Sequence, residues 1–288
     1  MGITSSNIPI SAVIITLNEE SNIVRCLNSL DFVDEVVIYD SGSKDRTIAF
    51  AQQMSLFTSG RVKLNIIQGE WLGFGPTKNK ATSLTTHSWV LSIDADEVVS
   101  LELKQELQNL KNLNPESEKN SYLVPRRSFY LNRWIDHGGW SPDYQLRIFN
   151  KVYWQWDLAP IHEKVMAAKP NFKSEKLISP MNHFVFKNIE HQVQTNNRYS
   201  TLQAEKMLKE GKSFNWFHFL TKPHVKFIEC FYWKLGFLDG WAGFVIAVSA
   251  GYSVFLKWAK LAELQKNQLA ELQKNQLKEL QNQKKRSE

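Results

Sequence analysis

The chain has 288 residues, which is enough for one large domain or for a domain with an appendage. Its hydrophobic content of 43% and charged content of 22% are typical of a globular protein. The two cysteines, Cys26 and Cys230, exclude a disulfide framework and a CxxC zinc site, and the formal net charge of +6 indicates anionic partners: nucleotide phosphates, nucleic acid or an acidic membrane surface.

Short apolar runs alternate with helical patterns through the first hundred residues. We expect strands at residues 10–17, 33–39, 63–67 and 89–93. We expect helices after residue 22, from 47 to 51 and around 81–85, the last of them preceded by a glycine-rich loop at 70–80. This alternation at short spacing predicts an α/β fold with a doubly wound, mostly parallel sheet flanked by helices.

Each expected strand ends in polar residues. Thr16 and Asn18 follow the first strand, Asp40 ends the second, and Asp94 and Asp96 follow the fourth. Parallel strands place these ends at one edge of the sheet, where ligands bind in open α/β folds. We therefore expect these side chains to share one site.

Asp94 and Asp96 come directly after the buried run that ends at Ile93. Unpaired carboxylates are very costly to bury, so we expect both to lie just beyond the strand, in a cleft. Two hard oxygen ligands at this position suit Mg²⁺ or Mn²⁺ holding a diphosphate. The alternative is a solvated acidic turn followed by a helix N-cap.

After residue 100 the regular alternation of strands and helices ends. A helix is expected over residues 101–113, a loop over 114–120 and an extended segment from 121 to 124. Residues 126–156 are dense in aromatics and arginines, which predicts short strands and loops that form either a ligand-binding wall beside the expected diphosphate site or a tryptophan-rich core. Three arginines are candidates to bind phosphates of such a ligand, or else belong to a solvated face: Arg126, Arg127 and Arg133.

The C-terminal third is expected to be helical after a last strand within residues 179–188. The mostly apolar run 241–256 is shorter than a bilayer span and is followed by Lys257. We favour an amphipathic segment lying in the membrane interface, with tryptophan and lysine at the headgroups. The alternatives are docking of this segment on the α/β domain and a single spanning helix.

Residues 261–280 repeat Leu-Ala-Glu-Leu-Gln-Lys-Asn-Gln with a period of eight. Eight residues at about 100° each overshoot two helical turns by about 80°. Leucines of successive repeats therefore lie on different sides of the helix and do not form a coiled-coil seam. We therefore expect a polar, partly helical tail without chemistry of its own.

Four motifs, each placed after a strand, give the chain a family resemblance. In order and spacing they resemble those of family 2 glycosyltransferases, inverting sugar-nucleotide enzymes of the GT-A fold. The motifs are Thr16-Leu17-Asn18-Glu19-Glu20, Asp40-Ser41-Gly42-Ser43-x-Asp45, Lys78-Asn79 and Asp94-Ala95-Asp96.

Further segments indicate one branch of this family, and the resemblance covers roughly residues 10–260. Together they resemble the lipopolysaccharide core β-1,4-glucosyltransferase branch of the family. They are residues 70–75, 124–127, 137–147, 162–164 and 236–240.

This resemblance implies a role for each residue at the strand ends. Asp96 is the expected main metal ligand, and Asp94 is expected to hold the ribose, or the metal through water. Lys78 is expected to add positive charge near the phosphates. The residues expected to grip the uracil and ribose are Thr16, Asn18, Glu20 and Asp40. For Asp40 and Asp45 the alternative is an Asx-turn and a helix cap.

The general base is expected to be a carboxylate on the acceptor side of the cleft. Asp143 is the first candidate because a Pro-Asp turn projects it from a loop ahead of Gln145 and Arg147, although the family usually has Glu-Asp at this point. Glu163 is the second candidate. His162 or His183 is either a further metal ligand or structural.

From these observations we expect three regions: a GT-A catalytic domain at 1–198, a helical membrane-associated region at 199–260 and a polar repeat tail at 261–288. The expected reaction moves a sugar, glucose from UDP-glucose by resemblance, to an inner-core heptose of a lipid-linked oligosaccharide. The alternatives are another UDP-sugar with a polyprenyl or polysaccharide acceptor, and a non-catalytic nucleotide-binding membrane adaptor.

The expected location is the cytoplasmic face of a bacterial inner membrane. The N-terminal residues lack a basic region followed by a long apolar run, so we expect no secretory signal, and the few cysteines fit a reducing compartment. The basic charge is dispersed and no aromatic-basic binding motif is present, which argues against a nucleic-acid partner.

Overall fold

The structure is a computed structural model that describes residues 7–110, 120–159, 163–169 and 172–287. It contains two compact units. The first, called the sheet unit below, comprises residues 1–129 and 142–185, and the second, the helical unit, comprises residues 130–141 and 186–288. The domain bounds at 198 and 260 stay a prediction, because compactness does not show which part folds on its own.

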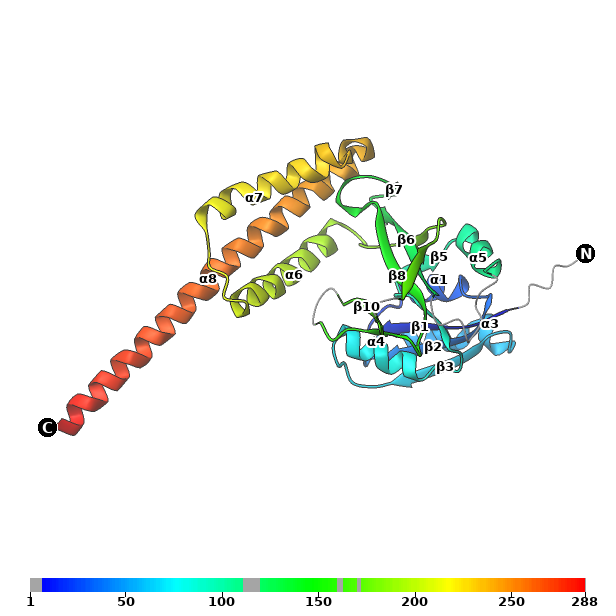
Figure 1. Cartoon of the computed structure of the whole chain (residues 1–288), viewed down its shortest axis with the longest axis horizontal. Coiled ribbons are helices and arrows are strands. Elements are labelled where there is room, and N and C mark those ends of the chain that lie inside the picture. Colours follow the sequence, from blue (N-terminus) through cyan, green and yellow to red (C-terminus); the bar gives the residue numbers. More distant parts are fainter. Residues whose placement is uncertain (1–6, 111–119, 160–162, 170–171, 288) are drawn as a thin grey trace, which may run out of the picture. The chain divides into compact units, whose positions relative to one another are not determined.

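Four parallel strands form the first half of the sheet unit, and the sequence predicted all four. Their order in the sheet is β3-β2-β1-β4 (Figure 1 labels β1, β2 and β3), and Thr16 at the end of β1 is in register with Asp40 at the end of β2. Apolar, β-branched residues explain the strands. Their bounds are β1 Ile8–Thr16, β2 Val33–Asp40, β3 Lys63–Gln68 and β4 Trp89–Ser92.

Five helices connect or follow these strands: α1 Ile23–Asn28, α2 Thr47–Gln53, α3 Ser55–Thr58, α4 Phe74–Ser83 and α5 Leu101–Gln108. The loop expected through residue 80 is wrong, because α4 already begins at Phe74. Gly73 adopts φ 96° just before the helix, and Pro76 lies in the first turn, where its missing N–H costs nothing. Helix α5 ends at Gln108 and not at residue 113.

The second half of the sheet reverses direction. Strand β8 is antiparallel to both β4 and β6, and the order continues β4-β8-β6-β12-β5, with β11 beside β6. The start of β8 therefore lies at the edge where β4 ends. The bounds are β5 Glu97–Val99, β6 Asn120–Tyr130, β8 Asp143–Asn150, β11 Lys173–Lys176 and β12 Met181–His183.

The expectation of only short strands and loops is wrong for β6, which runs for 11 residues. Pro125 and the two arginines after it hid this strand, because proline argues against a central strand. A separate small sheet pairs β9 Trp154–Trp156 with β10 Val165–Ala167.

The core of the sheet unit lies on both faces of β1. Ile10 and Ile14 pack with α1 on one face, and Val13 packs with Val37 and Val90 on the other. Each of these side chains is at most 1% exposed, which for a residue of this size contributes about 1.5–3 kcal/mol. The predicted α/β fold class, with a mostly parallel sheet between helices, is confirmed.

The helical unit is built around α8, which lies alongside α6 and α7 (Figure 1). Asn196 on α6 donates a hydrogen bond of 2.6 Å to Ser249 on α8, and the rings of Phe219 and Phe255 lie 5.0 Å apart across α7 and α8. The repeat tail is helical through Ser287. The elements are β7 Arg133–Ile135, η1 Gly138–Trp140, α6 Ile189–Lys209, α7 Trp216–Ile228, η2 Glu229–Trp233 (a π-helical turn), η3 Gly236–Asp239 and α8 Gly240–Ser287.

Close packing explains the glycines in two of the segments that carry the family resemblance, residues 137–147 and 236–240. A Cβ on Gly243 would lie 1.8 Å from the carbonyl oxygen of Gly236, and one on Gly139 would lie 2.9 Å from Cys230 Sγ. Buried Asp239 accepts hydrogen bonds from the backbone N–H groups of Asp136 (3.4 Å) and His137 (2.9 Å). These motif residues therefore hold the helical unit together.

Candidate active site

The loops that follow β1 and β2 are joined by side chain to backbone hydrogen bonds. Asn18, with φ 57°, accepts a bond from Lys44 N at 2.8 Å through Oδ1, and Glu20 accepts one from Arg46 N at 3.1 Å. Asp45 accepts bonds from Thr47 N (3.0 Å) and Glu20 N (3.1 Å), an Asx-turn just before α2; the N-cap of that helix is Arg46 and not Asp45. Asn18 and Glu20 thus brace the loop that follows Asp40.

Asp40 is fully buried, and its carboxylate accepts hydrogen bonds from Gly42 N at 3.3 Å and Ser43 N at 3.0 Å, as in an Asx-turn. Unlike the Asp40 carboxylate, two hydroxyls at these strand ends, Thr16 Oγ1 and Ser41 Oγ, are buried without a hydrogen-bond partner within the described residues. Buried polar groups nearly always have partners, so these two hydroxyls at neighbouring strand ends are available to a polar ligand.

Lys78 on α4 joins two of the predicted site residues. Its Nζ lies 3.1 Å from Asp94 Oδ1 and 3.0 Å from Glu163 Oε1, and it also lies 4.4 Å from the centre of the Trp156 ring. The Lys78 side chain is only 5% exposed, so its charge is directed to these carboxylates and not to solvent.

Arg147 on β8 binds the other oxygen of Asp94. Its Nη2 donates to Asp94 Oδ2 at 2.6 Å and also to Glu97 Oε1. Glu97, at the start of β5, is fully buried, and its Oε2 accepts a bond from Asp94 N at 3.0 Å. Both oxygens of Asp94 are therefore paired with cations.

Arg126 on β6 continues the pairing towards Asp143. Its Nη1 lies 3.1 Å from Glu97 Oε1, and its Nε donates to Asp143 Oδ2 at 2.8 Å. Gln145 donates to Asp143 Oδ1 at 2.6 Å. Antiparallel pairing places Arg126 directly opposite Asp143, which explains why these side chains meet.

Seven side chains thus form a continuous series of alternating charge, called the ion-pair chain below. It has four carboxylates and three cations, and the two candidate bases stand at its ends. In order its members are Asp143, Arg126, Glu97, Arg147, Asp94, Lys78 and Glu163.

The ion-pair chain fixes the charge of its central members. Burial alone would raise the pKa of Asp94, but Arg147 and Lys78 outweigh it and hold that pKa far below the ordinary value for aspartate. Burial would likewise lower the pKa of Arg147, yet Asp94 and Glu97 raise it above its ordinary value. Asp94 therefore stays ionised, and Arg147 stays a cation.

Asp96 stands outside the ion-pair chain. Its side chain is 29% exposed, and its Oδ2 lies 3.3 Å from Nε2 of His183, which is the last residue of β12. A partly exposed carboxylate beside an imidazole suits a divalent cation that takes its other ligands from water or phosphate. The described part of the chain holds no group of three His, Cys, Asp or Glu side chains placed to bind a metal. The other histidine considered, His162, lies outside the described residues.

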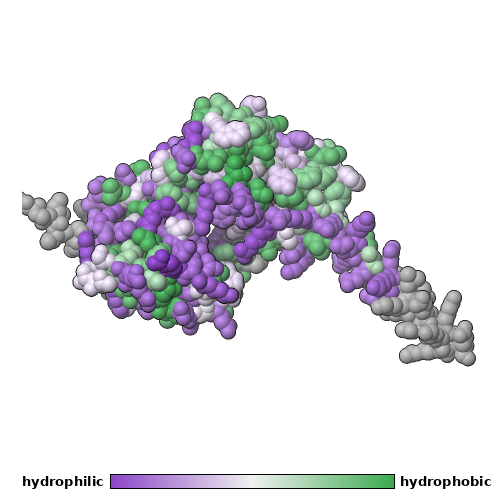
Figure 2. Space-filling view, turned by 180° about the vertical axis from the view of Figure 1, so that it is seen from behind, coloured by the Kyte–Doolittle hydropathy of each residue, from purple (hydrophilic) through white to green (hydrophobic). Residues whose placement is uncertain are grey.

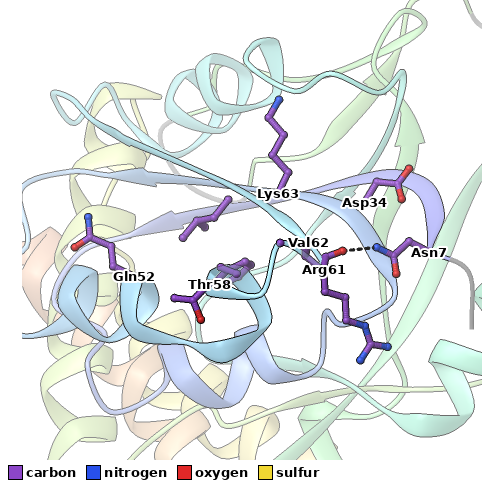
Figure 3. Close-up of a pocket in the computed structure, with 10 residues that line it drawn as sticks. Asn7, Asp34, Gln52, Thr58, Arg61, Val62 and Lys63 are labelled. Carbon is purple, nitrogen blue, oxygen red and sulfur yellow. Dashed lines mark hydrogen bonds between the residues drawn. The ribbon is translucent and has the colours of Figure 1, made fainter. Parts of the chain in front are cut away.

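A hollow of about 610 Å³ lies elsewhere, beside the first residues of β2 and β3 (Figure 3). Its lining includes Asp34, Arg61 and Lys63, and Asn7 donates a hydrogen bond of 2.8 Å to the carbonyl of Arg61. The strand ends that carry the predicted site residues are at the opposite edge of the sheet. The hollow contains none of those residues, so the geometry of the charges, and not this cavity, defines the candidate site.

Sequence reasoning missed the two residues at the centre of the ion-pair chain. Glu97 and Arg147 received no role, although a buried arginine in an apolar strand is a signal that a carboxylate lies near. For Arg126 the sequence left two alternatives, binding of phosphates or a solvated face; in the structure it pairs with Glu97 and Asp143. Arg133 lies in the helical unit, where its Nη2 is 3.5 Å from Asp239.

An open α/β sheet whose polar residues converge beyond its strand ends is the arrangement in which nucleotide ligands bind. The model of glycosyl transferase family 2 matches residues 11–172, a span that contains the predicted nucleotide-binding residues, both candidate bases, Asp94 and Asp96, but not His183. An uncharacterised glycosyltransferase of Rickettsia felis is 30% identical over 261 residues, covering 88% of this chain and 89% of the relative. The chain therefore belongs to glycosyl transferase family 2, and it is a glycosyltransferase.

A second relative has a more specific name. LpsC of Rhizobium meliloti, a lipopolysaccharide core biosynthesis glycosyltransferase, is 28% identical over 260 residues, covering 88% of this chain and 92% of LpsC. Among solved structures, Staphylococcus aureus TarS in complex with UDP-GlcNAc is similar with a TM-score of 0.46, at 15% identity over 88% of this chain and 90% of that one.

Proposed function

We propose that this glycosyltransferase moves glucose from UDP-glucose to an inner-core heptose of a lipopolysaccharide precursor, with inversion at the sugar carbon. The observation that carries the acceptor class is the likeness to LpsC over 88% of the chain. Glucose and heptose follow from the motif resemblance between residues 10 and 260. The acceptor is then a lipid-linked oligosaccharide at the cytoplasmic face of the inner membrane.

The nucleotide is proposed to bind at the ends of β1 and β2. Thr16 Oγ1 and Ser41 Oγ supply buried hydroxyls without partners among the described side chains, and these fit the polar edge of a uracil and a ribose. Asp40, with the loops braced by Asn18 and Glu20, shapes this part of the site. Because the loop already binds both Asp40 oxygens, a ribose contact at Asp40 requires the Ser43 bonds to be shared.

A divalent cation, Mg²⁺ or Mn²⁺, fits Asp96 together with His183, and it would supply positive charge to the diphosphate. Asp94 is proposed to act beside them: its ion pairs with Lys78 and Arg147 keep it ionised and fixed next to the cation site. Lys78 is already paired with two carboxylates, so its own charge is largely balanced before a phosphate binds.

Asp143 is proposed as the general base that takes the proton of the acceptor hydroxyl. Its side chain is 31% exposed, while Arg126 and Gln145 hold its two oxygens in one orientation. A base must lie within hydrogen-bond reach of its proton and keep that geometry. Glu163 is the alternative base; its side chain is 15% exposed, and Lys78 binds one of its oxygens.

A second candidate keeps the class of enzyme but changes its substrates. It uses another UDP-sugar and a polyprenyl or polysaccharide acceptor, and the same site residues serve it. A nucleotide-binding adaptor without catalysis is disfavoured, because such a protein has no need of carboxylates held beside a cation site.

The test is UDP release by the purified full chain with Mg²⁺ or Mn²⁺, across a panel of UDP-sugars, with and without truncated lipopolysaccharide that ends in heptose. We expect release above background only with UDP-glucose and that acceptor. Release with another sugar or acceptor would retain the class of enzyme and overturn the specificity. Binding of UDP without release under any condition would overturn the proposal.

A further inference from the structure

One face of helix α8 is apolar and exposed. Its residues recur every three or four positions, so they line a single stripe along the helix. The stripe consists of Trp241 (68% exposed), Phe244 (40%), Val248 (46%), Tyr252 (44%) and Phe255 (39%). A contiguous stripe of five exposed, large apolar side chains marks an interaction site on a protein surface.

Helix α7 and the turn after it extend this apolar face. The two helices run antiparallel, with the Phe227 and Phe244 rings 6.0 Å apart near one end and Phe219 and Phe255 5.0 Å apart towards the other. Figure 2 shows hydrophobic residues gathered over this part of the helical unit. The further exposed members are Trp216 (68%), Phe217 (71%), Leu220 (58%), Tyr232 (56%) and Trp233 (70%). We call the ten residues the aromatic face.

Lysines accompany the aromatic face in excess over acids. Residues 211–260 contain six lysines and only two acidic residues, Glu229 and Asp239. Asp239 is buried and Glu229 pairs with Lys226 and Lys234, so neither acid is available to the remaining lysines. Within the described residues, Lys222 and Lys257 form no ion pair.

The same lysines also repel one another. Burial lowers the pKa of Lys257, and the nearby charges of Lys222, Lys212 and Lys226 lower it further. Lys257 follows Phe255 by two residues, about 200° round α8, so it lies on the side of the helix away from the apolar stripe. Lys222 lies 5.1 Å from the ring of buried Trp258. A helix pair that is apolar on one side and cationic on the other is complementary to a surface that offers both hydrocarbon and phosphates.

The opposite side of α8 argues against burial of the whole helix in a bilayer. By length and composition Gly236–Asn275 could cross a membrane. However, Asn196 bonds to Ser249, and Lys260 Nζ donates to the side chains of Ser200 and Thr201 at 2.8 Å, so the α6 side of α8 is polar. Polar and charged groups at that depth are costly in hydrocarbon, whereas a helix lying in the interface keeps them in water.

We propose that the aromatic face of α7 and α8, with Lys222 and Lys257, docks in the interface of a bilayer that contains anionic phospholipids. The aromatic rings enter the boundary between headgroups and acyl chains, and the ammonium groups bind the lipid phosphates. This surface lies wholly in the helical unit and needs no particular donor or acceptor. It serves the proposed function by holding the enzyme at the surface where a lipid-linked acceptor lies.

The test is co-sedimentation of the full chain with phosphatidylcholine vesicles, with and without phosphatidylglycerol. We expect strong binding only when the anionic lipid is present. The variant Trp241→Ser/Tyr252→Ser should reduce partitioning at least tenfold, and Lys222→Gln/Lys257→Gln should reduce it by more than about tenfold at low salt, because each lysine near an anionic surface contributes about fivefold. Alkaline carbonate should release the wild-type protein from the vesicles.

Each control removes the same type of side chain as its variant, but from the sheet unit. Leu158→Ser/Ile178→Ser removes two exposed apolar side chains of the sheet unit, and Lys164→Gln/Lys173→Gln removes two of its lysines; both should bind as the wild type does. UDP binding in solution, measured without vesicles, should be the same in all variants, which separates this proposal from the proposed function.

Three outcomes would overturn the docking surface. Equal binding of the aromatic-face variants and their controls would place the contact elsewhere. Resistance to carbonate extraction would indicate a spanning helix. Self-association in sedimentation velocity that the Trp241→Ser/Tyr252→Ser variant abolishes, without vesicle binding by the wild type, would show that a second copy covers the aromatic face.

Discussion

The sheet unit gathers seven charged side chains into the ion-pair chain and pairs every one of them, whereas the helical unit leaves the ten apolar side chains of the aromatic face exposed to solvent. In the sheet unit, Glu97 is fully buried and Arg147 is 4% exposed, yet both have partners within the chain. In the helical unit, Trp216 and Trp241 are each 68% exposed.

The difference shows where each unit finds its partners. A buried charge is stable only when the fold supplies its counter-charge, so the ion-pair chain is a product of the sheet and of its strand register. An exposed aromatic stripe has no such internal partner, and its complement must come from outside the chain. Variants that disturb one unit should therefore differ in kind from variants that disturb the other.

The largest expected effect on stability comes from breaking the ion-pair chain at its centre. Arg147→Met leaves Asp94 and buried Glu97 without their shared cation, and the loss of one partner from a buried pair costs about 3–5 kcal/mol. Urea unfolding measures the change. Arg61→Met, which removes a surface pair with Asp31, is the control and should cost less than about 1 kcal/mol. Equal effects of the two substitutions would show that the buried pairs do not stabilise the sheet unit.

A smaller effect is expected from overpacking the helical unit. Gly243→Ala places a methyl group where the carbonyl oxygen of Gly236 lies, 1.8 Å from the new Cβ, and should cost about 1–3 kcal/mol. Thermal unfolding followed by tryptophan fluorescence measures the loss. Ser253→Ala on the same helix should leave stability nearly unchanged. If Gly243→Ala also leaves the unfolding temperature unchanged, the close packing of α8 on Gly236 does not constrain this position.

The smallest expected effect concerns acid stability. The pKa of Asp94 is held below its ordinary value in the folded state, so its contribution is complete above the unfolded value of about 3.9 and is lost as pH falls below it. Asp94→Asn should therefore destabilise by about 1–2 kcal/mol at neutral pH, because Asp94 is 32% exposed, and its deficit should shrink in acid. Unfolding curves at several pH values test this, and a deficit that is constant with pH would contradict it.

The sequence predicted those parts of the sheet unit that depend on local pattern. The four parallel strands and the convergence of their polar ends follow from apolar runs and spacing. Lys78 was predicted to add charge near the phosphates, and its pairing with Asp94 was not predicted. Helix α4 began earlier than expected because Gly73 and Pro76 act there as start signals for a helix, and in a glycine-rich stretch they look like loop residues.

The ion-pair chain could not be predicted in the same way. Its contacts join residues that are far apart in sequence, such as Arg147 with Asp94 and Lys78 with Glu163. Arg126 meets Asp143 only because β6 and β8 pair antiparallel in one particular register, and a shift by one residue would turn the arginine to the other face. The helical unit differs again, because its exposed stripe can be read from local spacing along α8.

The measurement that tests the account most directly compares Asp143→Asn with Glu163→Gln, the two ends of the ion-pair chain. Transfer from UDP-glucose to heptose-terminated truncated lipopolysaccharide is measured as UDP release, with UDP binding as the check that each variant is folded. We predict that Asp143→Asn lowers turnover by about 10²–10⁴-fold at unchanged UDP affinity, as expected for the loss of a general base, while Glu163→Gln loses much less. Near-normal turnover of Asp143→Asn, with UDP binding intact, would contradict the assignment of the base.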